Sequence, residues 1–204
     1  MKNKNSKILR LAQTALFAAL CFVSFTFIQI KIPVPGGGAT SLHIGNAFCV
    51  LAALLLGGWY GGLAGAIGMT IADLLDPVYI LSAPKTFLLK LCIGLITGLV
   101  AHKYAKINSS NSRQYVFKWV IISSSAGLGF NVIFDPIIGY FYKQYILGQP
   151  QKVAAVLAKL SAATTFVNAI VSVILVSLIY NAVIPSLRRS GFLLREEKNK
   201  SIEG

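Results

Sequence analysis

The stretch IADLLDPVYILSAPKTFLLK, residues 71–90, places two aspartates and two lysines within an otherwise apolar sequence. The whole chain has the same character, since 55% of its 204 residues are hydrophobic and 12% are charged. A soluble globular protein of this composition would expose more apolar surface than its charged residues could cover. The composition therefore predicts an all-α integral membrane protein, and it makes the four charged side chains of this stretch candidates for function.

Six apolar segments approach the length of about 20 residues that a helix needs to cross a bilayer. We expect the six transmembrane helices at 8–30, 46–58, 60–76, 84–104, 116–141 and 163–186. Only GGWYGG, residues 57–62, separates the second segment from the third, so these are either two short helices joined by a tight turn or one long broken helix. The chain is predicted to be a single transmembrane domain, 1–204, with a basic cytoplasmic tail at 187–204.

A net charge of +13 is compatible with nucleic-acid binding, but the basic residues are not gathered on one face with interleaved aromatics, so no nucleic-acid partner is expected. Most of the 19 basic residues lie before the first segment, around the link from the fourth to the fifth, and after the sixth. With six crossings these regions share one side, which the positive-inside rule assigns to the cytoplasm. Both termini are therefore predicted to be cytoplasmic, with loops 31–45, 77–83 and 142–162 outside.

With this topology, the polar residues of the apolar segments gather in the outer half of the membrane. Asp73 and Lys90 lie near the outer ends of the third and fourth segments, Asn131 and Asp135 lie one turn apart on the fifth, and Asn168 is on the sixth. An ionisable side chain at membrane depth costs about 3 kcal/mol, so it usually faces a partner or a wet cavity. The pattern predicts an outward-opening polar pocket.

Two interpretations of the charges in residues 71–90 remain open. In one, Asp73 or Asp76 pairs with Lys90 as a clamp between the third and fourth helices, while Lys85 reaches the membrane surface. In the other, Asp73 and Lys90 contact what binds in the pocket. Asp76 precedes a proline, so it also suits the end of a helix.

The first outer loop, within KIPVPGGGATSLHIGNAF at 31–48, is expected to fold over the pocket. Two prolines stiffen its start, and three consecutive glycines permit backbone conformations and close approaches that other residues cannot adopt. Polar side chains at its end supply hydrogen-bonding groups. The residues expected in this cap are Gly36, Gly37, Gly38, Thr40, Ser41 and His43.

No catalytic or metal-binding set is apparent. The chain has two histidines and lacks the GxSxG, HExxH and GxxxxGK[ST] motifs. Its three cysteines fall in apolar segments, where they are expected to be small buried hydrophobes rather than disulfides or metal ligands. We therefore expect a protein that is not an enzyme and has no cofactor or metal.

Small residues at four-residue spacing mark faces where helices can approach closely in lipid. Gly57, Gly61 and Gly65 follow this spacing and are expected to pack internally. Ala15 and Ala19, on the first helix, follow it too. Those two alanines either pack internally or meet a second membrane protein.

Two stretches resemble a known family. HIGNAFCVLAALLLGGWYGGLAGAIG at 43–68 and ADLLDPVYILSAPKTFLLKLCIGLITGLVA at 72–101 resemble the substrate-binding S components of energy-coupling factor (ECF) vitamin transporters, in the group that includes riboflavin-like S components. The resemblance implies a multi-pass protein of the cell membrane that captures a vitamin or vitamin-like molecule outside. It also implies partners, a transmembrane coupling subunit and two cytoplasmic ATPases, whose ATP hydrolysis drives release inside.

Carried onto this chain, the resemblance makes residues 31–45 the capping loop and places the pocket at the outer ends of the fourth, fifth and sixth helices. It implies that Ala15 and Ala19 dock on the coupling subunit. The substrate contacts that it implies are Asn46, Tyr79, Thr86, Lys90, Asn131, Asp135 and Asn168.

The charges and amides of this set suit a small polar heterocycle, such as a pyridoxine or hydroxymethylpyrimidine type vitamin or a deazapurine precursor of queuosine. Riboflavin is the alternative ligand, and it would require more aromatic stacking surface than the pocket helices offer. The alternative of a different class is a membrane scaffold or assembly protein, or a membrane enzyme. A scaffold would bind a partner but no small ligand, and an enzyme would show turnover without ATPase partners.

Overall fold

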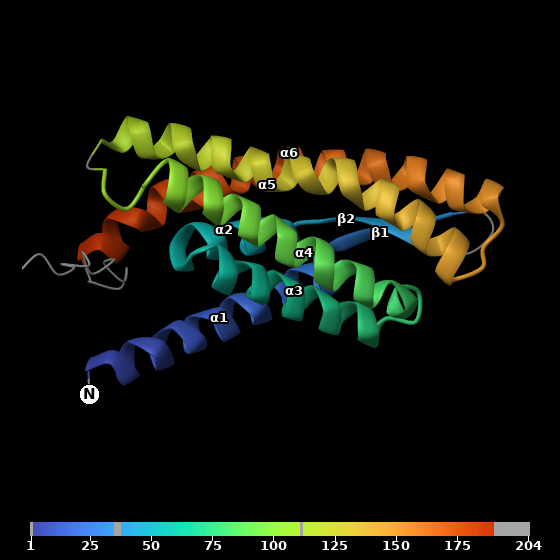
Figure 1. The fold of residues 1–204 in the computed structure, drawn as a ribbon, viewed down its shortest axis with the longest axis horizontal. Coiled ribbons are helices and arrows are strands. Elements are labelled where there is room, and N and C mark those ends of the chain that lie inside the picture. Colours follow the sequence, from blue (N-terminus) through green and yellow to red (C-terminus); the bar gives the residue numbers. More distant parts are fainter. Residues whose placement is uncertain (1, 35–37, 111, 190–204) are drawn as a thin grey trace, which may run out of the picture.

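The computed structural model describes residues 2–34, 38–110 and 112–189, in which six helices and a β-hairpin form one bundle (Figure 1). Gly36 and Gly37 of the predicted cap, and residues 190–204 of the predicted basic tail, lie outside the described residues. The elements are α1 (Lys2–Phe27), β1 (Gln29–Pro33), β2 (Ala39–His43), α2 (Gly45–Leu56), α3 (Gly58–Leu75), α4 (Ala83–Gly98), α5 (Arg113–Phe141) and α6 (Gln151–Arg189). A 3-10 turn, Ile80–Ser82, precedes α4, and the π-helical turns Leu99–Tyr104 and Tyr142–Ile146 extend α4 and α5.

Within the described residues, four helical stretches are long and apolar enough to cross a membrane. They are Lys7–Phe27, Ile80–Tyr104, Arg113–Ile146 and Gln151–Ser186, while α2 is a shorter apolar helix. The predicted helical membrane bundle is confirmed at this level. Six crossings with two cytoplasmic termini stay a prediction.

Glycines let α2, α3 and α4 pack backbone against backbone. Gly57 has φ of 97°, a conformation that suits glycine, and there the chain reverses from α2 into α3. A Cβ on Gly61 would lie 2.2 Å from the backbone nitrogen of Ala53 in α2. A Cβ on Gly94 of α4 would lie 2.2 Å from Cα of Gly62. The second and third apolar segments are thus two short helices, and their small residues are used internally.

The two ends of the bundle differ in the segments that they carry (Figure 1). The N-terminus, the link from α4 to α5 and the C-terminal part of α6 lie at one end. The end of β1, the start of β2, the link from α3 to α4 and the link from α5 to α6 lie at the other. The parts of the three basic regions that the structure describes therefore lie at one end, which is the arrangement that two cytoplasmic termini would need.

The first outer loop is a β-hairpin rather than an irregular segment. Strands β1 and β2 pair antiparallel, with Gln29 opposite His43 and Pro33 opposite Ala39. The expectation of an all-α chain missed these strands because prolines and glycines dominate the loop. The alternation of Ile30, Lys31 and Ile32 is the signal that could have indicated β1.

The last helix begins at Gln151, twelve residues before the predicted start at 163. The predicted outer loop at 142–162 is therefore mostly helical, and only residues 147–150 link the two helical stretches. Lys152 and Lys159 lowered the apparent hydropathy of this region, although both are exposed while Ala154 and Leu157 are buried. Such a helical alternation of buried and exposed positions continues α6 beyond its apolar section.

Candidate functional site

A polar cavity of about 100 Å³ lies at the hairpin end of the bundle, between β2 and the adjoining parts of α3, α4, α5 and α6. Polar and charged side chains predominate in its wall, in contrast to the apolar helix surfaces around it. Its polar and charged lining residues are Thr40, Ser41, His43, Asp73, Tyr79, Ser82, Lys85, Thr86, Lys90, Asp135, Lys143, Ser161, Thr164, Thr165 and Asn168.

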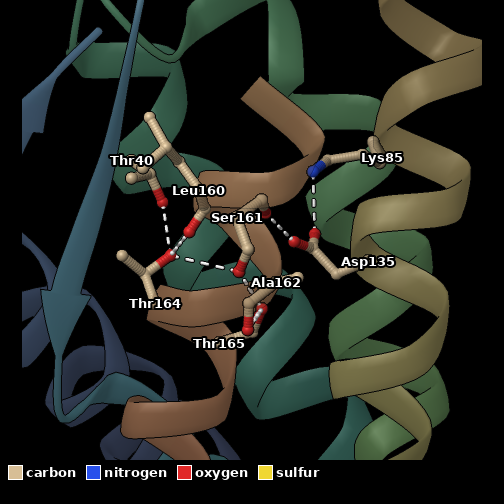
Figure 2. A network of polar contacts seen from close by, with 8 residues as sticks. All are labelled: Thr40, Lys85, Asp135, Leu160, Ser161, Ala162, Thr164 and Thr165. Carbon is tan, nitrogen blue, oxygen red and sulfur yellow. Dashed lines mark hydrogen bonds and ion pairs between the residues drawn. The ribbon is translucent and has the colours of Figure 1, made fainter. Parts of the chain in front are cut away.

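One ion pair and one hydroxyl join α4, α5 and α6 at this cavity (Figure 2). Lys85 Nζ lies 2.7 Å from Asp135 Oδ1, and the Ser161 hydroxyl donates to Asp135 Oδ2. The side chains of Lys85 and Asp135 are only 11% and 12% exposed. A Cβ on Gly139, one turn beyond Asp135, would lie 3.4 Å from Lys85 Nζ, so the glycine leaves room for the ammonium.

The hairpin is tied to α6 by polar side chains. Asn168 Oδ1 accepts the backbone N–H of His43 at 3.0 Å, and Asn168 Nδ2 donates to the carbonyl of Ser41 at 3.0 Å. The hydroxyls of Thr40 and Thr164 lie 2.6 Å apart (Figure 2). Both hydrogen-bonding ends of the Asn168 amide are thus used to hold β2 over the cavity.

Lys90 is the least satisfied charge of the site. Its side chain lines the cavity and the residue is 7% exposed. Among the described residues, its ammonium has no ion pair and no hydrogen bond, and it interacts with Asp135 and Asp73 only at longer range. Asp73, 2% exposed, lies beside Thr86. The cavity therefore contains an ammonium group that is free to bind an acceptor.

His43 contributes a neutral ring to the cavity wall. The ring packs edge-on against Phe25, with 4.6 Å between the centroids. Burial, reinforced by the positive charge of Lys90, lowers the pKa of His43 from 6.5 to about 3. Its Nδ1 is buried without a hydrogen-bond partner among the described residues and lies towards Gly45 of α2, where an added Cβ would be 3.4 Å away.

The structure brings most of the predicted contact residues together. Thr40, Ser41 and His43 of the cap line the cavity, together with Tyr79, Thr86, Lys90, Asp135 and Asn168. Asn46 and Asn131 are each 1% exposed and lie in the packed interior, outside the cavity lining. Gly38 of the cap, with φ of 98°, precedes β2.

Six other polar lining residues were not predicted as contacts, namely Ser82, Lys85, Lys143, Ser161, Thr164 and Thr165. Ser161 fell within the predicted outer loop, which placed it away from the helices. The spacing of Ser161, Thr164, Thr165 and Asn168 follows one face of a helix, and this spacing was the signal that could have identified them.

Of the two interpretations left open for the charges of residues 71–90, the clamp between α3 and α4 is wrong. Lys85, predicted to reach the surface, pairs with Asp135 of α5. Lys90 forms an ion pair with neither Asp73 nor Asp76. Asp76 instead pairs with Lys31 of β1, with 2.5 Å between Nζ and Oδ2, because the hairpin lies beside the end of α3. Asp76 also accepts the backbone N–H of Val78 at 3.0 Å, just after α3 ends.

A larger cavity, of about 850 Å³, is built mostly of apolar side chains from α1, α2, α3, α4 and α6. Leu16, Leu55 and Leu99 line it, with Arg10 and His102 among its few polar residues. It shares no lining residue with the cavity under the hairpin. Size alone therefore does not identify the ligand site, because the polar groups that can orient a ligand gather elsewhere.

The alanines of α1 divide between two surfaces. Ala15 and Ala19 are exposed on the bundle. Ala18 packs internally, since a Cβ on Gly68 of α3 would lie 2.2 Å from its carbonyl oxygen. A smooth strip of α1 is thus left uncovered by the rest of the described chain.

The chain is similar in sequence and in fold to known proteins. The family model described as ECF-type riboflavin transporter, S component, matches residues 5–184. The chain belongs to this S component family. None of the curated proteins compared with the chain is significantly similar to it.

Two solved structures share the fold of this S component. One, described as ThiT from Listeria monocytogenes, aligns with a TM-score of 0.65 at 18% identity, over 89% of this chain and 98% of that one. The other, described as the S component of a bacterial ECF transporter, aligns with a TM-score of 0.55 at 23% identity, over 96% of this chain and 100% of that one. The protein is therefore a multi-pass cell-membrane subunit of a transporter and not an enzyme.

S components are the substrate-binding subunits of ECF transporters, and they act with a membrane coupling subunit and ATPases. In this S component, the polar cavity under the hairpin has the groups that a substrate site requires. It combines a free ammonium, a neutral imidazole and a charged network on rigid helices.

Proposed function

We propose that this S component captures a vitamin or vitamin-like small molecule at the outer end of the bundle and delivers it inward with a coupling subunit and two ATPases. The observation that carries this proposal is the polar cavity beneath β2, which draws side chains from α3, α4, α5 and α6 into one place. In a membrane protein such a concentration of ionisable groups marks a ligand pathway. The hairpin, held to α6 by Asn168, acts as the cap.

A small polar heterocycle is the proposed ligand, of the pyridoxine or hydroxymethylpyrimidine type or a precursor of queuosine. The cavity volume of about 100 Å³ supports a small ligand, because sites for larger molecules commonly measure about 300–1,000 Å³. Aromatic rings in the wall are few, with Phe25 and Tyr79 beside His43. Riboflavin is the second candidate, favoured by the description of the matching family.

The contacts proposed for the ligand are the side chains that reach the cavity. Lys90 is the central one, with Tyr79 and Thr86 beside it, and Asp135 on the facing helix. Asn168 contributes chiefly by holding the cap. We propose supporting positions behind these contacts for Asn46 and Asn131, which are buried.

The membrane topology proposed for delivery has six crossings and both termini in the cytoplasm. The gathering of the basic regions at one end of the bundle supports it (Figure 1). Docking on the coupling subunit is proposed for the strip at Ala15 and Ala19, because small exposed residues allow a partner helix to approach closely.

A thermal-shift screen of detergent-purified protein against water-soluble vitamins and their precursors tests the capture role. A ligand at a hundred times its Kd stabilises the folded protein by about 2.7 kcal/mol. A large shift with one compound and its close analogues would support capture of that compound. No shift with any compound, in protein shown to be folded, would favour the scaffold alternative.

Docking is tested by replacing alanines with leucine and measuring co-purification with the coupling subunit and ATPases. We expect Ala15→Leu and Ala19→Leu to lose the partner while keeping the ligand-induced thermal shift. Ala182→Leu, at an exposed position of α6, is the matched control and should keep both. Retention of the partner by both α1 variants would refute docking at this strip.

A further inference from the structure

The cavity under the hairpin has more positive than negative side chains. Three lysines line it, Lys85, Lys90 and Lys143, against two aspartates, Asp73 and Asp135. The neutral histidine of β2 does not change this balance. The ionisable side chains of the wall therefore carry one positive charge in excess.

The excess charge can be assigned to one side chain. Lys85 is neutralised by Asp135 at 2.7 Å. Lys143 is only partly buried, so water can solvate its ammonium. Lys90 is 7% exposed and has no ion-pair or hydrogen-bond partner among the described residues. A buried ammonium without a partner is unfavourable, so a group that accepts from Lys90 would stabilise the site.

We propose that the ligand of this S component carries an acid group, a carboxylate or a phosphate monoester, whose oxygens accept hydrogen bonds from the Lys90 ammonium. The inference rests on the proposed function and narrows it to small heterocyclic acids. Such an anion balances the excess charge of the wall, and its contact with an ammonium forms a charge-assisted hydrogen bond. Asp73, which also lines the cavity, is then available to a polar atom of the heterocycle.

Ligands of other charge fit this wall less well. A cationic heterocycle would add a second unbalanced positive charge close to Lys90, which like-charge repulsion disfavours. A neutral heterocycle would leave the ammonium without a counter-ion after the cap has excluded water. Neutral hydroxymethylpyrimidine type ligands and neutral queuosine precursors are therefore less suited to this cavity than acids of similar size.

Matched pairs of compounds test the inference by calorimetric titration of detergent-purified protein. The pairs are nicotinate with nicotinamide, 4-pyridoxate with pyridoxine, and pyridoxine phosphate with pyridoxine. We expect one acid to bind at least about tenfold more tightly than its neutral twin, the scale of a charge-assisted hydrogen bond. Comparison of the carboxylate pairs with the phosphate pair shows which of the two acid groups the site binds.

Substitution of two lysines tests whether Lys90 causes the preference for the acid over its neutral twin. We expect Lys90→Met to weaken binding of the acid by at least about tenfold and binding of its neutral twin much less, so that most of the preference is lost. Lys159→Met, at an exposed position of α6 outside the cavity, should keep the preference. Thermal melting without ligand shows that each variant is folded, and methionine fills a similar volume.

Three results would overturn the inference. Tighter binding of the neutral twin than of its acid in every pair that binds, or an equal loss for both twins in Lys90→Met, refutes the acid group while leaving the proposed function in place. If no panel compound binds but a neutral vitamin gives a strong thermal shift, the acid group is likewise refuted and the proposed function stays in place. Absence of binding by every compound in both experiments counts against the proposed function itself, and the inference then fails with it.

Discussion

Lys85→Met is expected to be the most informative single perturbation of stability. The change leaves the Asp135 carboxylate, 12% exposed, with the Ser161 hydroxyl but without its ammonium partner at 2.7 Å. Removing one member of a buried ion pair typically costs about 3–5 kcal/mol. For a chain of this length, about 1 kcal/mol corresponds to about 2–4 °C in melting temperature, so the midpoint should fall by about 10 °C.

The assay is thermal melting of ligand-free protein in detergent, followed by a double-mutant cycle. Lys85→Met with Asp135→Asn removes both charges, so most of the lost stability should return. Lys152→Met, at an exposed position of α6, should melt within about 1 °C of the wild type. A Lys85→Met midpoint within about 2 °C of the wild type, or a double variant no more stable than the single one, would refute the role of this pair.

Three further predictions concern the cap, the helix packing and the pH response. Asn168→Ala should speed amide hydrogen exchange in β2 and weaken ligand binding, because two hydrogen bonds to the strand are lost; Val167→Ala, on the exposed side of α6, should change neither. Gly94→Ala should lower the melting temperature by forcing α3 and α4 apart, whereas Gly129→Ala, where a Cβ meets nothing within 4 Å, should not; equal melting of both would contradict the packing. His43, with its pKa lowered to about 3, stays unprotonated in the folded protein while the unfolded chain binds a proton below pH 6.5, so stability should fall as pH drops from about 6.5 towards 3. His43→Gln should flatten that part of the stability profile, and an unchanged profile would show that His43 does not titrate in this way.

Several features followed from the sequence because they depend on composition and short spacing. The apolar segments predicted a helical membrane bundle, since backbone groups in lipid must be satisfied within helices. Polar residues inside those segments indicated the cavity, and Lys90, Asp135 and Asn168 do lie at it. The stretches at 43–68 and 72–101 indicated the S component family, to which the chain belongs.

Other features depended on the tertiary structure, because they join residues that are distant in the chain. The pairing of Lys85 with Asp135 rather than with the aspartates of 71–90 spans 50 positions, and no local pattern distinguishes one counter-ion from another. The role of Asn168 in holding β2 likewise spans 125 positions. The sequence by itself determined that charges lie within the membrane and on which helices. Only the packing of those helices decided which charges neutralise each other and which one, Lys90, has no counter-ion among the described residues, because pairing requires approach within about 4 Å in three dimensions.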